Sequence, residues 1–443
     1  MKRRLANSMV AAVLVFFAGL ATCPAQAQAP ASAPATSAAS MLIDSMDGPS
    51  AWKCEQNESS IVMSADDSPH EGKAAVKFNV KLGKTYAVAY RLAKPDAAWN
   101  DYGGLSFWVK GDGSDNYGCL RVQAGSWDKA WLGNFPLKDA EWHEVRLAWG
   151  DLVPSGASIP ELGTADGCRP GDINLVAFGK SWNFNTSHKS PEITFSIDDL
   201  RLVRGVKSSR TRVSVDKFPP VSAVVEKLKA GKPVTILALG DSITWGTNVD
   251  GNAHAYPAML GKMLSEYYKN DKITVVNKAI GGSTTAKGRQ WLNRDVRGVE
   301  ADLVTVMFGF NEMPSEKTRD KDAAAKAFTA NLVRYIEEAA GTMKAPPACV
   351  FIATVPGKDK HWETLDPYAA AVRELVKAHP NTAVADANGR IKSLGKEAYA
   401  RMMTDEAHPN ADGHREIAKA LFETITGVKA PEPAPSSTAP GAH

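Results

Sequence analysis

The sequence predicts two folded domains of different class, an antiparallel β-sandwich followed by an α/β domain built on a parallel sheet. Three observations predict this arrangement. The chain has 443 residues, which at about 100 to 200 residues per domain allows two or three domains. From about residue 41 to residue 206 the dominant apolar period is two, as in half-buried strands. Beyond about residue 207, short apolar runs alternate with helical stretches.

The first domain shows its strands by alternation of apolar and polar residues. Val76 to Leu82, Leu105 to Lys110 and Ile193 to Asp198 each place apolar side chains at every second position. Turn residues such as Gly111-Asp112-Gly113 separate these runs, and no convincing helical pattern interrupts them. Many short strands without helices favour a sandwich over residues 41–206.

The second domain, residues 233–429, follows a connection at residues 207–232. Its predicted parallel strands are short apolar runs: Val234 to Leu239, Ile273 to Val276, Leu303 to Phe308, Val350 to Thr354 and Ala383 to Ala385. Its predicted helices lie between or after them: Tyr256 to Tyr268, Asp322 to Ala340, Asp366 to Ala378 and Ala411 to Thr424. Such alternation predicts a doubly wound sheet with its site at the carboxyl ends of the strands.

The N-terminus has the pattern of a secretory signal peptide at residues 1–27. Lys2 to Arg4 form a positive region, Met9 to Ala21 an apolar region, and Ala25-Gln26-Ala27 a small-residue cleavage site. A lipoprotein signal ending at Cys23 is the alternative interpretation. The apolar region is too short to favour a spanning helix, so we expect a secreted or periplasmic protein without stable membrane insertion.

Composition bounds the remaining segments and the partners. Residues 28–40 and 430–443 are rich in Ala, Pro and Ser, which predicts a flexible linker and a disordered tail. Without the three basic residues of the signal, 49 Lys and Arg balance 49 Asp and Glu, because the whole chain has 52 and 49. This balance gives no electrostatic footprint for nucleic acid. The sequence does not indicate an oligomeric state.

Export permits disulfides. Cys54, Cys119 and Cys168 lie in the first domain and allow at most one bridge there, with the pairing open. Cys349 lies in an apolar run and is expected to be a buried strand thiol. No cysteine pattern has the spacing of a zinc site.

Polar blocks at the ends of the predicted strands carry the candidate chemistry. The first strand leads into Gly240-Asp241-Ser242, the second into Asn277 to Thr284, and the third into Gly309 to Glu312. Because parallel strands end at the same edge of a sheet, we expect these blocks to lie close together. A Gly-rich turn exposes backbone N–H groups, and an asparagine adds a side-chain donor.

A fourth block, Asp405 to Asn410, precedes the last predicted helix. The imidazole of His408 can take a proton from the Ser242 hydroxyl. The Asp405 carboxylate, three residues earlier, can orient and stabilise that ring. Among the competing histidines, His414 is expected to be a surface or structural residue.

Taken together, the four blocks resemble those of the SGNH (GDSL-like) serine hydrolases over about residues 233–427. The resemblance implies a three-layer α/β/α, flavodoxin-like hydrolase domain. It also implies that Ser242 is the nucleophile of a triad with His408 and Asp405. The oxyanion hole would comprise the backbone N–H groups of Ser242 and Gly282 and the side chain of Asn311. No metal or other cofactor is required by this chemistry.

Other residues near the four blocks have less specific expected roles. Gly281 is an alternative to its neighbour Gly282, and Glu312 stands where the family usually has Asp after the Asn. Asp241, Trp245 and His254 are further candidates for contacts with substrate, as Gly281 is. His361 falls in a predicted loop that could line the same cleft.

The first domain is rich in tryptophan, with eight of the 11 Trp residues of the chain. Most are expected in the core, but Trp108 is expected to face away from its apolar neighbours Phe107 and Val109. It could stack on a sugar, or it could be covered by a loop or by the hydrolase domain. The segment Ile193 to Leu202 is similar to the closing strand of galactose-binding-like jelly-roll domains. That resemblance implies a carbohydrate-binding role and names Asp44 and Asp198 as candidate ligands of a structural Ca²⁺.

Three functions remain open from the sequence. The first is an exported carbohydrate esterase that removes acetyl groups from an acetylated polysaccharide. The second is a lipid or thioester hydrolase with the same serine chemistry. The third is a non-catalytic glycan-binding protein in which the hydrolase domain is a scaffold.

Overall fold

The computed structural model describes eight stretches of the chain, and all of them belong to one compact unit. These stretches are residues 40–83, 85–126, 129–156, 159–163, 168–180, 192–250, 252–313 and 320–431. The predicted signal peptide, most of the predicted linker, nearly all of the C-terminal tail, Trp127 and Trp182 lie outside them. Within the described residues, we find no helix with the length and apolarity needed to cross a bilayer.

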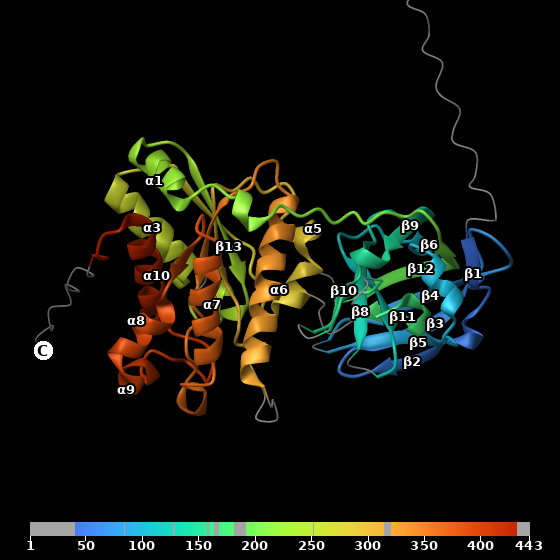
Figure 1. Cartoon of the computed structure of the whole chain (residues 1–443). Coiled ribbons are helices and arrows are strands. Elements are labelled where there is room, and N and C mark those ends of the chain that lie inside the picture. The colour runs from blue at the N-terminus through green and yellow to red at the C-terminus, as the bar shows by residue number, and fades with distance from the viewer. Residues whose placement is uncertain are drawn as a thin grey trace, which may run out of the picture. The chain divides into compact units, whose positions relative to one another are not determined.

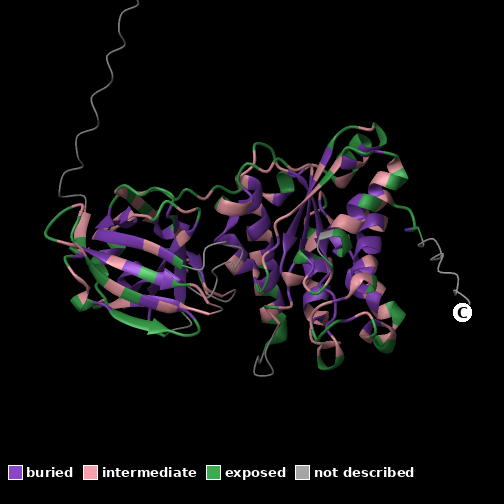
Figure 2. Cartoon of the chain, turned by 180° about the vertical axis from the view of Figure 1, so that it is seen from behind, coloured by how far each residue is buried: buried purple, intermediate pink, exposed green. Residues whose placement is uncertain are grey.

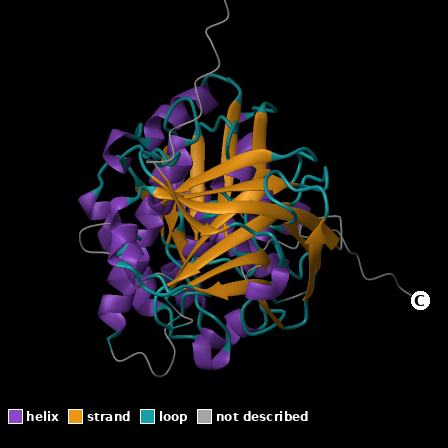
Figure 3. Ribbon diagram, turned by 90° about the vertical axis from the view of Figure 1, so that its right-hand side faces the viewer, coloured by secondary structure: helices purple, strands orange, loops and turns teal. Residues whose placement is uncertain are grey.

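The first domain is a sandwich of two antiparallel sheets (Figures 1 and 3). The first sheet has the order β3-β4-β12-β6-β9, with β1 also paired to β12, and the second has the order β10-β8-β7-β11-β5-β2. Its strands are β1 (Ser40–Asp44), β2 (Lys53–Gln56), β3 (Ser60–Asp66), β4 (Ala75–Lys81), β5 (Ala87–Leu92), β6 (Gly104–Lys110), β7 (Tyr117–Gln123), β8 (Ala130–Pro136), β9 (His143–Ala148), β10 (Val153–Pro154), β11 (Leu175–Lys180) and β12 (Glu192–Val203). This confirms the predicted all-β class.

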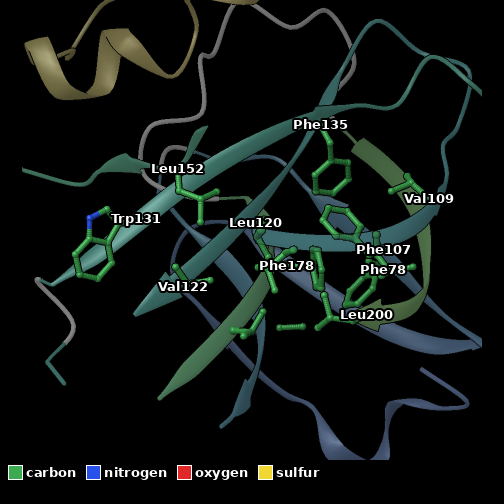
Figure 4. Close-up of a cluster of buried hydrophobic side chains, with 14 of the residues drawn as sticks. Phe78, Phe107, Val109, Leu120, Val122, Trp131, Phe135, Leu152, Phe178 and Leu200 are labelled. Atoms are coloured by element: carbon green, nitrogen blue, oxygen red, sulfur yellow. The ribbon is translucent and has the colours of Figure 1, made fainter. Parts of the chain in front are cut away.

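Aromatic side chains fill the space between the two sheets (Figure 4). Phe78 of β4 stacks on Phe195 of β12 with ring centroids 5.1 Å apart, and Phe107 of β6 meets Phe178 of β11 edge to face at the same separation. All four rings are buried. The alternation read from the sequence therefore identified the inward face of these strands.

Trp108 does face outward, but a loop covers it. The His70 ring stacks on the Trp108 ring with centroids 3.5 Å apart. The Trp142 ring meets the His70 ring edge to face. The covering loop is held because Asp198 accepts hydrogen bonds from the N–H groups of His70 and Glu71. One face of Trp108 is therefore not available as a sugar platform, which corrects the simplest expectation from its alternation.

The two candidate calcium ligands already have protein partners. Asp44 pairs with Arg91 at 2.7 Å, and Asp198 is fully buried against backbone N–H groups. In the described part of the chain, no group of three or more His, Cys, Asp or Glu side chains could hold a metal ion. Cys54, Cys168 and Cys349 are free thiols, Cys119 is buried in β7, and Cys349 is buried in a strand as expected.

The second domain contains a five-stranded sheet with all strands parallel. Its order is β14-β13-β15-β16-β17, so the second strand along the chain lies outside the first, as in flavodoxin-like folds. The strands are β13 (Val234–Gly240), β14 (Ile273–Asn277), β15 (Leu303–Met307), β16 (Ala348–Ile352) and β17 (Ala383–Ala385). Near-continuous burial along β13, β15 and β16 follows from covering the sheet on both faces (Figure 2).

Helices cover both faces of this sheet (Figure 1). One apolar layer joins the sheet to α1, α3, α8 and α10, and a second joins it to α6 and α7. The helices are α1 (Val221–Lys229), α2 (Ser242–Trp245), α3 (Tyr256–Tyr268), α4 (Thr285–Arg289), α5 (Leu292–Asp295), α6 (Lys321–Gly341), α7 (Asp366–Ala378), α8 (Ala387–Leu394), α9 (Lys396–Ala400) and α10 (Ala411–Thr426). The three-layer α/β/α class is thereby confirmed.

Gly240, the last residue of β13, is required by close packing just before Ser242. A Cβ at this position would collide with the backbone oxygen of Met307 and with the side chain of Thr244. We expect Gly240→Ala to lower the free energy of unfolding by about 1–3 kcal/mol, as overpacking does. Urea unfolding measures this change.

Gly281→Ala is the matched control, because a Cβ there would meet no atom within 4 Å. Equal stabilities of the two variants would show that the strand end tolerates a side chain and would contradict the packing argument.

Candidate functional site

Ser242 lies at the turn between β13 and α2, where the parallel sheet ends. The strand ends at Gly240 and the helix begins at Ser242. Asp241 caps the helix, with its Oδ1 accepting a hydrogen bond of 2.9 Å from the N–H of Ile243. Ser242 is half-buried, so its hydroxyl is supported by the turn and still reachable.

The structure brings the other two predicted triad residues to this hydroxyl. Nε2 of His408 lies 2.8 Å from Oγ of Ser242, and Nδ1 of the same ring lies 2.7 Å from Oδ2 of Asp405. Asp405 Oδ1 accepts hydrogen bonds from the N–H groups of Ala407 and His408, 2.8 Å each. A carboxylate, an imidazole and a hydroxyl thus form one continuous chain of hydrogen bonds.

The Asp405 carboxyl is kept ionised by these partners. Partial burial acts to raise its pKa, but the His408 ring and the two backbone N–H groups outweigh burial and hold the pKa below its usual range. An ionised Asp405 favours the His408 tautomer with its proton on Nδ1, which leaves Nε2 free to accept the proton of Ser242.

Sequence reasoning missed a residue that supports this carboxylate. Asn248, in a left-handed conformation with φ 65°, donates a hydrogen bond of 2.8 Å from Nδ2 to Asp405 Oδ2. Its signal in the sequence was weak, because an Asn between α2 and α3 reads as an ordinary loop residue. A bridge between Met403 and Pro409 closes the loop that carries Asp405 and His408.

The candidate oxyanion donors come from two further strand ends. Gly282 follows β14 in a turn with φ 67°, a conformation that glycine adopts without strain. Asn311 follows β15, and its Nδ2 donates a hydrogen bond of 2.9 Å to the Ser283 carbonyl. Gly282 and Asn311 are both exposed, and a second N–H of the Asn311 amide remains after this bond.

Two carboxyl groups close to the nucleophile are buried. Burial raises the pKa of Asp241 to about 7; the Ile243 N–H opposes the rise and the nearby Glu312 adds to it. Burial likewise raises the pKa of Glu312 to about 7, although its Oε1 accepts a hydrogen bond from the N–H of Thr285. Glu312 is half-buried, and its Oε2 is enclosed with no hydrogen-bond partner among the residues that the structure describes.

The remaining candidates for substrate contact differ in what the structure allows. Asp241 is 1% exposed and caps α2, so its expected contact with substrate is corrected to a structural role. Trp245, at the end of α2, is 47% exposed, and Gly281 is exposed as well. His254 is exposed, and its ring contacts the Asp250 carbonyl at 3.3 Å.

Two other histidines have clear neighbours. Nε2 of His361 lies 3.4 Å from the carboxylate of Glu406. Glu406 follows Asp405 in the chain and precedes His408, so His361 borders the loop that carries these two residues. His414 is fully buried, and its Nδ1 accepts a hydrogen bond from the N–H of Tyr256. Burial lowers the pKa of His414 to about 4, which gives it a structural role.

The raised pKa values of Asp241 and Glu312 predict a stability that falls as pH rises. In the unfolded chain both carboxyls ionise near pH 4, whereas in the folded chain they hold their protons up to about pH 7. The folded state binds more protons in this window, so the free energy of unfolding should fall from pH 4 to pH 7, by about 1–3 kcal/mol. Urea unfolding at several pH values measures it.

Asp241→Asn and Glu312→Gln should each flatten this dependence, because neither amide ionises. The exposed Asp271→Asn variant should keep the wild-type slope. A wild-type slope in both buried-site variants would contradict the electrostatic assignment.

Comparison with known families agrees with this geometry. Residues 238–416 match the GDSL-like Lipase/Acylhydrolase family, and residues 29–197 match the Carbohydrate binding domain (family 11). The first match contains all the residues of the candidate triad and oxyanion hole. The second covers most of the sandwich.

Each of the following relatives aligns with less than half of this chain. An acetylxylan esterase from Geobacillus stearothermophilus is 24% identical over 212 residues, which are 45% of this chain and 96% of that protein. A mannan endo-1,4-beta-mannosidase from Bifidobacterium adolescentis is 28% identical over 164 residues, 35% of this chain and 16% of that one. The crystal structure of the esterase Axe2 from G. stearothermophilus has 23% identity and a TM-score of 0.36, and covers 44% of this chain and 94% of that one.

Sequence blocks, sheet topology and family matches therefore agree with one another. The chain thus carries a domain that matches the GDSL-like Lipase/Acylhydrolase family, preceded by a domain that matches the Carbohydrate binding domain (family 11).

Proposed function

We propose that this protein is an exported serine esterase that removes O-acetyl groups from polysaccharide. Ser242 acts as the nucleophile, His408 as the general base and acid, and Asp405 as the residue that orients the imidazole. The observation that carries the proposal is the hydrogen-bond chain of 2.8 Å and 2.7 Å that joins the three side chains.

The reaction proceeds through an acetyl-enzyme. Nε2 of His408 takes the Ser242 proton while Oγ attacks the acetyl carbonyl carbon. The bond between that carbon and the sugar oxygen then breaks, and the sugar leaves with the proton from His408. Water attacks the acetyl-enzyme, gives its proton to His408, and releases acetate as the Ser242 hydroxyl is restored.

The oxyanion of each tetrahedral intermediate needs hydrogen-bond donors that are in place before the reaction. The backbone N–H groups of Ser242 and Gly282 and the amide of Asn311 are the candidates. Support comes from their positions after β13, β14 and β15 and from the exposure of Gly282 and Asn311. Preorganised donors of this kind are worth roughly 10²- to 10³-fold each in turnover.

The substrate class rests on two similarities. A relative that aligns with 45% of this chain is described as an acetylxylan esterase, and the sandwich matches a carbohydrate-binding family. Both favour an acetylated glycan over a lipid or thioester. The proposed export rests on the signal pattern at residues 1–27.

Substitution of the triad tests the chemistry. We expect Ser242→Ala to lower the kcat for acetate release from acetylated xylan by roughly 10⁴-fold or more, and Asp405→Asn to lower it by up to about 10⁴-fold. Acetate release measures both, and a fluorophosphonate should label the wild type but not Ser242→Ala.

Ser393→Ala, which removes a serine hydroxyl from α8, is the control and should keep wild-type turnover. Wild-type turnover in Ser242→Ala would exclude the proposed nucleophile. A wild type that prefers long-chain acyl esters to acetylated xylan would instead favour the lipid hydrolase alternative.

Trp245 is the candidate for contact with the sugar chain, because it is exposed three residues after the nucleophile. An indole face stacks on the C–H face of a sugar. We expect Trp245→Ala to raise KM for acetylated xylo-oligosaccharide about 5- to 20-fold and to leave KM for p-nitrophenyl acetate within twofold. Steady-state kinetics on both substrates measures this. Equal changes in KM on the two substrates would contradict a sugar contact.

A further inference from the structure

The segment that carries Gly282 is anchored at its far end to the sandwich domain. The anchored segment comprises residues 280–295 and contains Gly282, α4 and α5. Within the hydrolase domain, the turn is held by a hydrogen bond of 3.0 Å from the Ile280 N–H to the Gly240 carbonyl and by the bond from Asn311 to the Ser283 carbonyl. The described residues leave open space around the Cβ positions of Gly281 and Gly282, and helix α4, with five residues, is too short to hold its own conformation. Contacts beyond α4 therefore help to fix where the Gly282 N–H points.

The first anchor is a buried cluster of charges around Arg289, the last residue of α4. The Arg289 side chain is inaccessible to solvent. It donates one hydrogen bond of 2.9 Å to Glu161 of the sandwich domain, and two, of 3.0 and 2.8 Å, to Glu338 of α6. Arg334 of α6 pairs with Glu161 at 3.0 Å, so this carboxylate bridges α4 and α6.

The connection between the domains adds a third arginine, Arg210, to the same cluster. Arg210 donates a hydrogen bond of 2.8 Å to Glu338, one of 3.1 Å to the Arg289 carbonyl, and one of 3.2 Å to the Asp151 carbonyl of the sandwich. Burial acts to raise the pKa of Glu338, but Arg289 and Arg210 outweigh it and lower the pKa to about 2. The Glu338 carboxylate therefore stays ionised near neutral pH and keeps its pairs with Arg289 and Arg210.

The second anchor is apolar. Trp291, just after α4, is 2% exposed and packs within the hydrophobic cluster of the sandwich, as does Ile280 before Gly282. The Trp291 ring meets Tyr117 of β7 edge to face at 5.7 Å. Asn134 of β8 donates a hydrogen bond of 3.3 Å to the Gln290 carbonyl. Both ends of the anchored segment thus touch the sandwich.

We propose that the sandwich domain positions the oxyanion hole of the hydrolase domain. It does so through the ion pair between Glu161 and Arg289 and through the apolar contacts that bury Trp291. Glu161 and Trp291 are positioning residues, because they act on the reaction through the anchored segment. The sandwich is then part of the catalytic apparatus in addition to any binding of glycan. This inference rests on the proposed serine esterase function.

Kinetics of the full-length chain on p-nitrophenyl acetate test the proposal, since this small ester offers no sugar for the sandwich to bind. We expect Glu161→Gln to lower kcat about 10- to 100-fold while KM stays within twofold, because a displaced donor weakens the transition state more than the ground state. Affinity for a phenylboronic acid, which forms a tetrahedral adduct with serine, should fall by the same factor. Glu161→Asp should recover part of the kcat.

Asp172→Asn is the matched control, because Asp172 is an exposed sandwich carboxylate paired with Arg169 at 3.3 Å. Its kcat should equal that of the wild type. Fluorophosphonate labelling counts the competent sites in each preparation, so kcat is expressed per labelled Ser242. If Glu161→Gln does not fold, Trp291→Phe serves as the test variant, with the same expected fall in kcat.

The outcomes separate the two proposals. An unchanged kcat per labelled site in the variant that folds would overturn the positioning role and leave the esterase function standing. A wild type without Ser242-dependent hydrolysis would overturn the esterase function, and the positioning role with it.

Discussion

The hydrogen bond of 2.8 Å between His408 and Ser242 joins two segments that are 166 residues apart, and the proposed function depends on it. A different local structure holds each partner in place for this bond. Ser242 is held by the turn that Asp241 caps, and His408 by the loop that Asp405 and Asn248 brace. The parallel sheet fixes the distance between the turn that holds Ser242 and the loop that holds His408. An esterase site therefore results from backbone placement first and from side-chain chemistry second.

Buried charge gives the hydrolase domain two different kinds of support. Around Arg289 and Glu338 the charges compensate one another, so burial leaves them ionised and holds segments of both domains together. Around Asp241 and Glu312, burial outweighs hydrogen bonding and favours the protonated carboxyls. Where the family usually has a shorter Asp, Glu312 reaches the N–H of Thr285 at the start of α4. The loop of Gly282 is thus held on both sides by carboxyl groups.

Periodicity and motif order were enough to predict both fold classes and the bounds of the long helices. Helices α3 and α7 lie where the apolar spacing placed them, whereas α4 and α5, with five and four residues, are too short to show a period. Local patterns also could not show that His70 covers Trp108. The ion pair between Glu161 and Arg289 joins residues that are 128 positions apart. The sequence around either residue contains no pattern that predicts this pair.

The pairing of β12 bears on how the sandwich is made. This strand is the last of its domain, yet it lies at the centre of its sheet and pairs with β1, β4 and β6. Contacts between strands this distant in sequence slow folding, and strand edges that stay unpaired are exposed to other chains. The first sheet is therefore completed only when the twelve-residue strand β12 has paired, and its earlier strands keep unpaired edges until then.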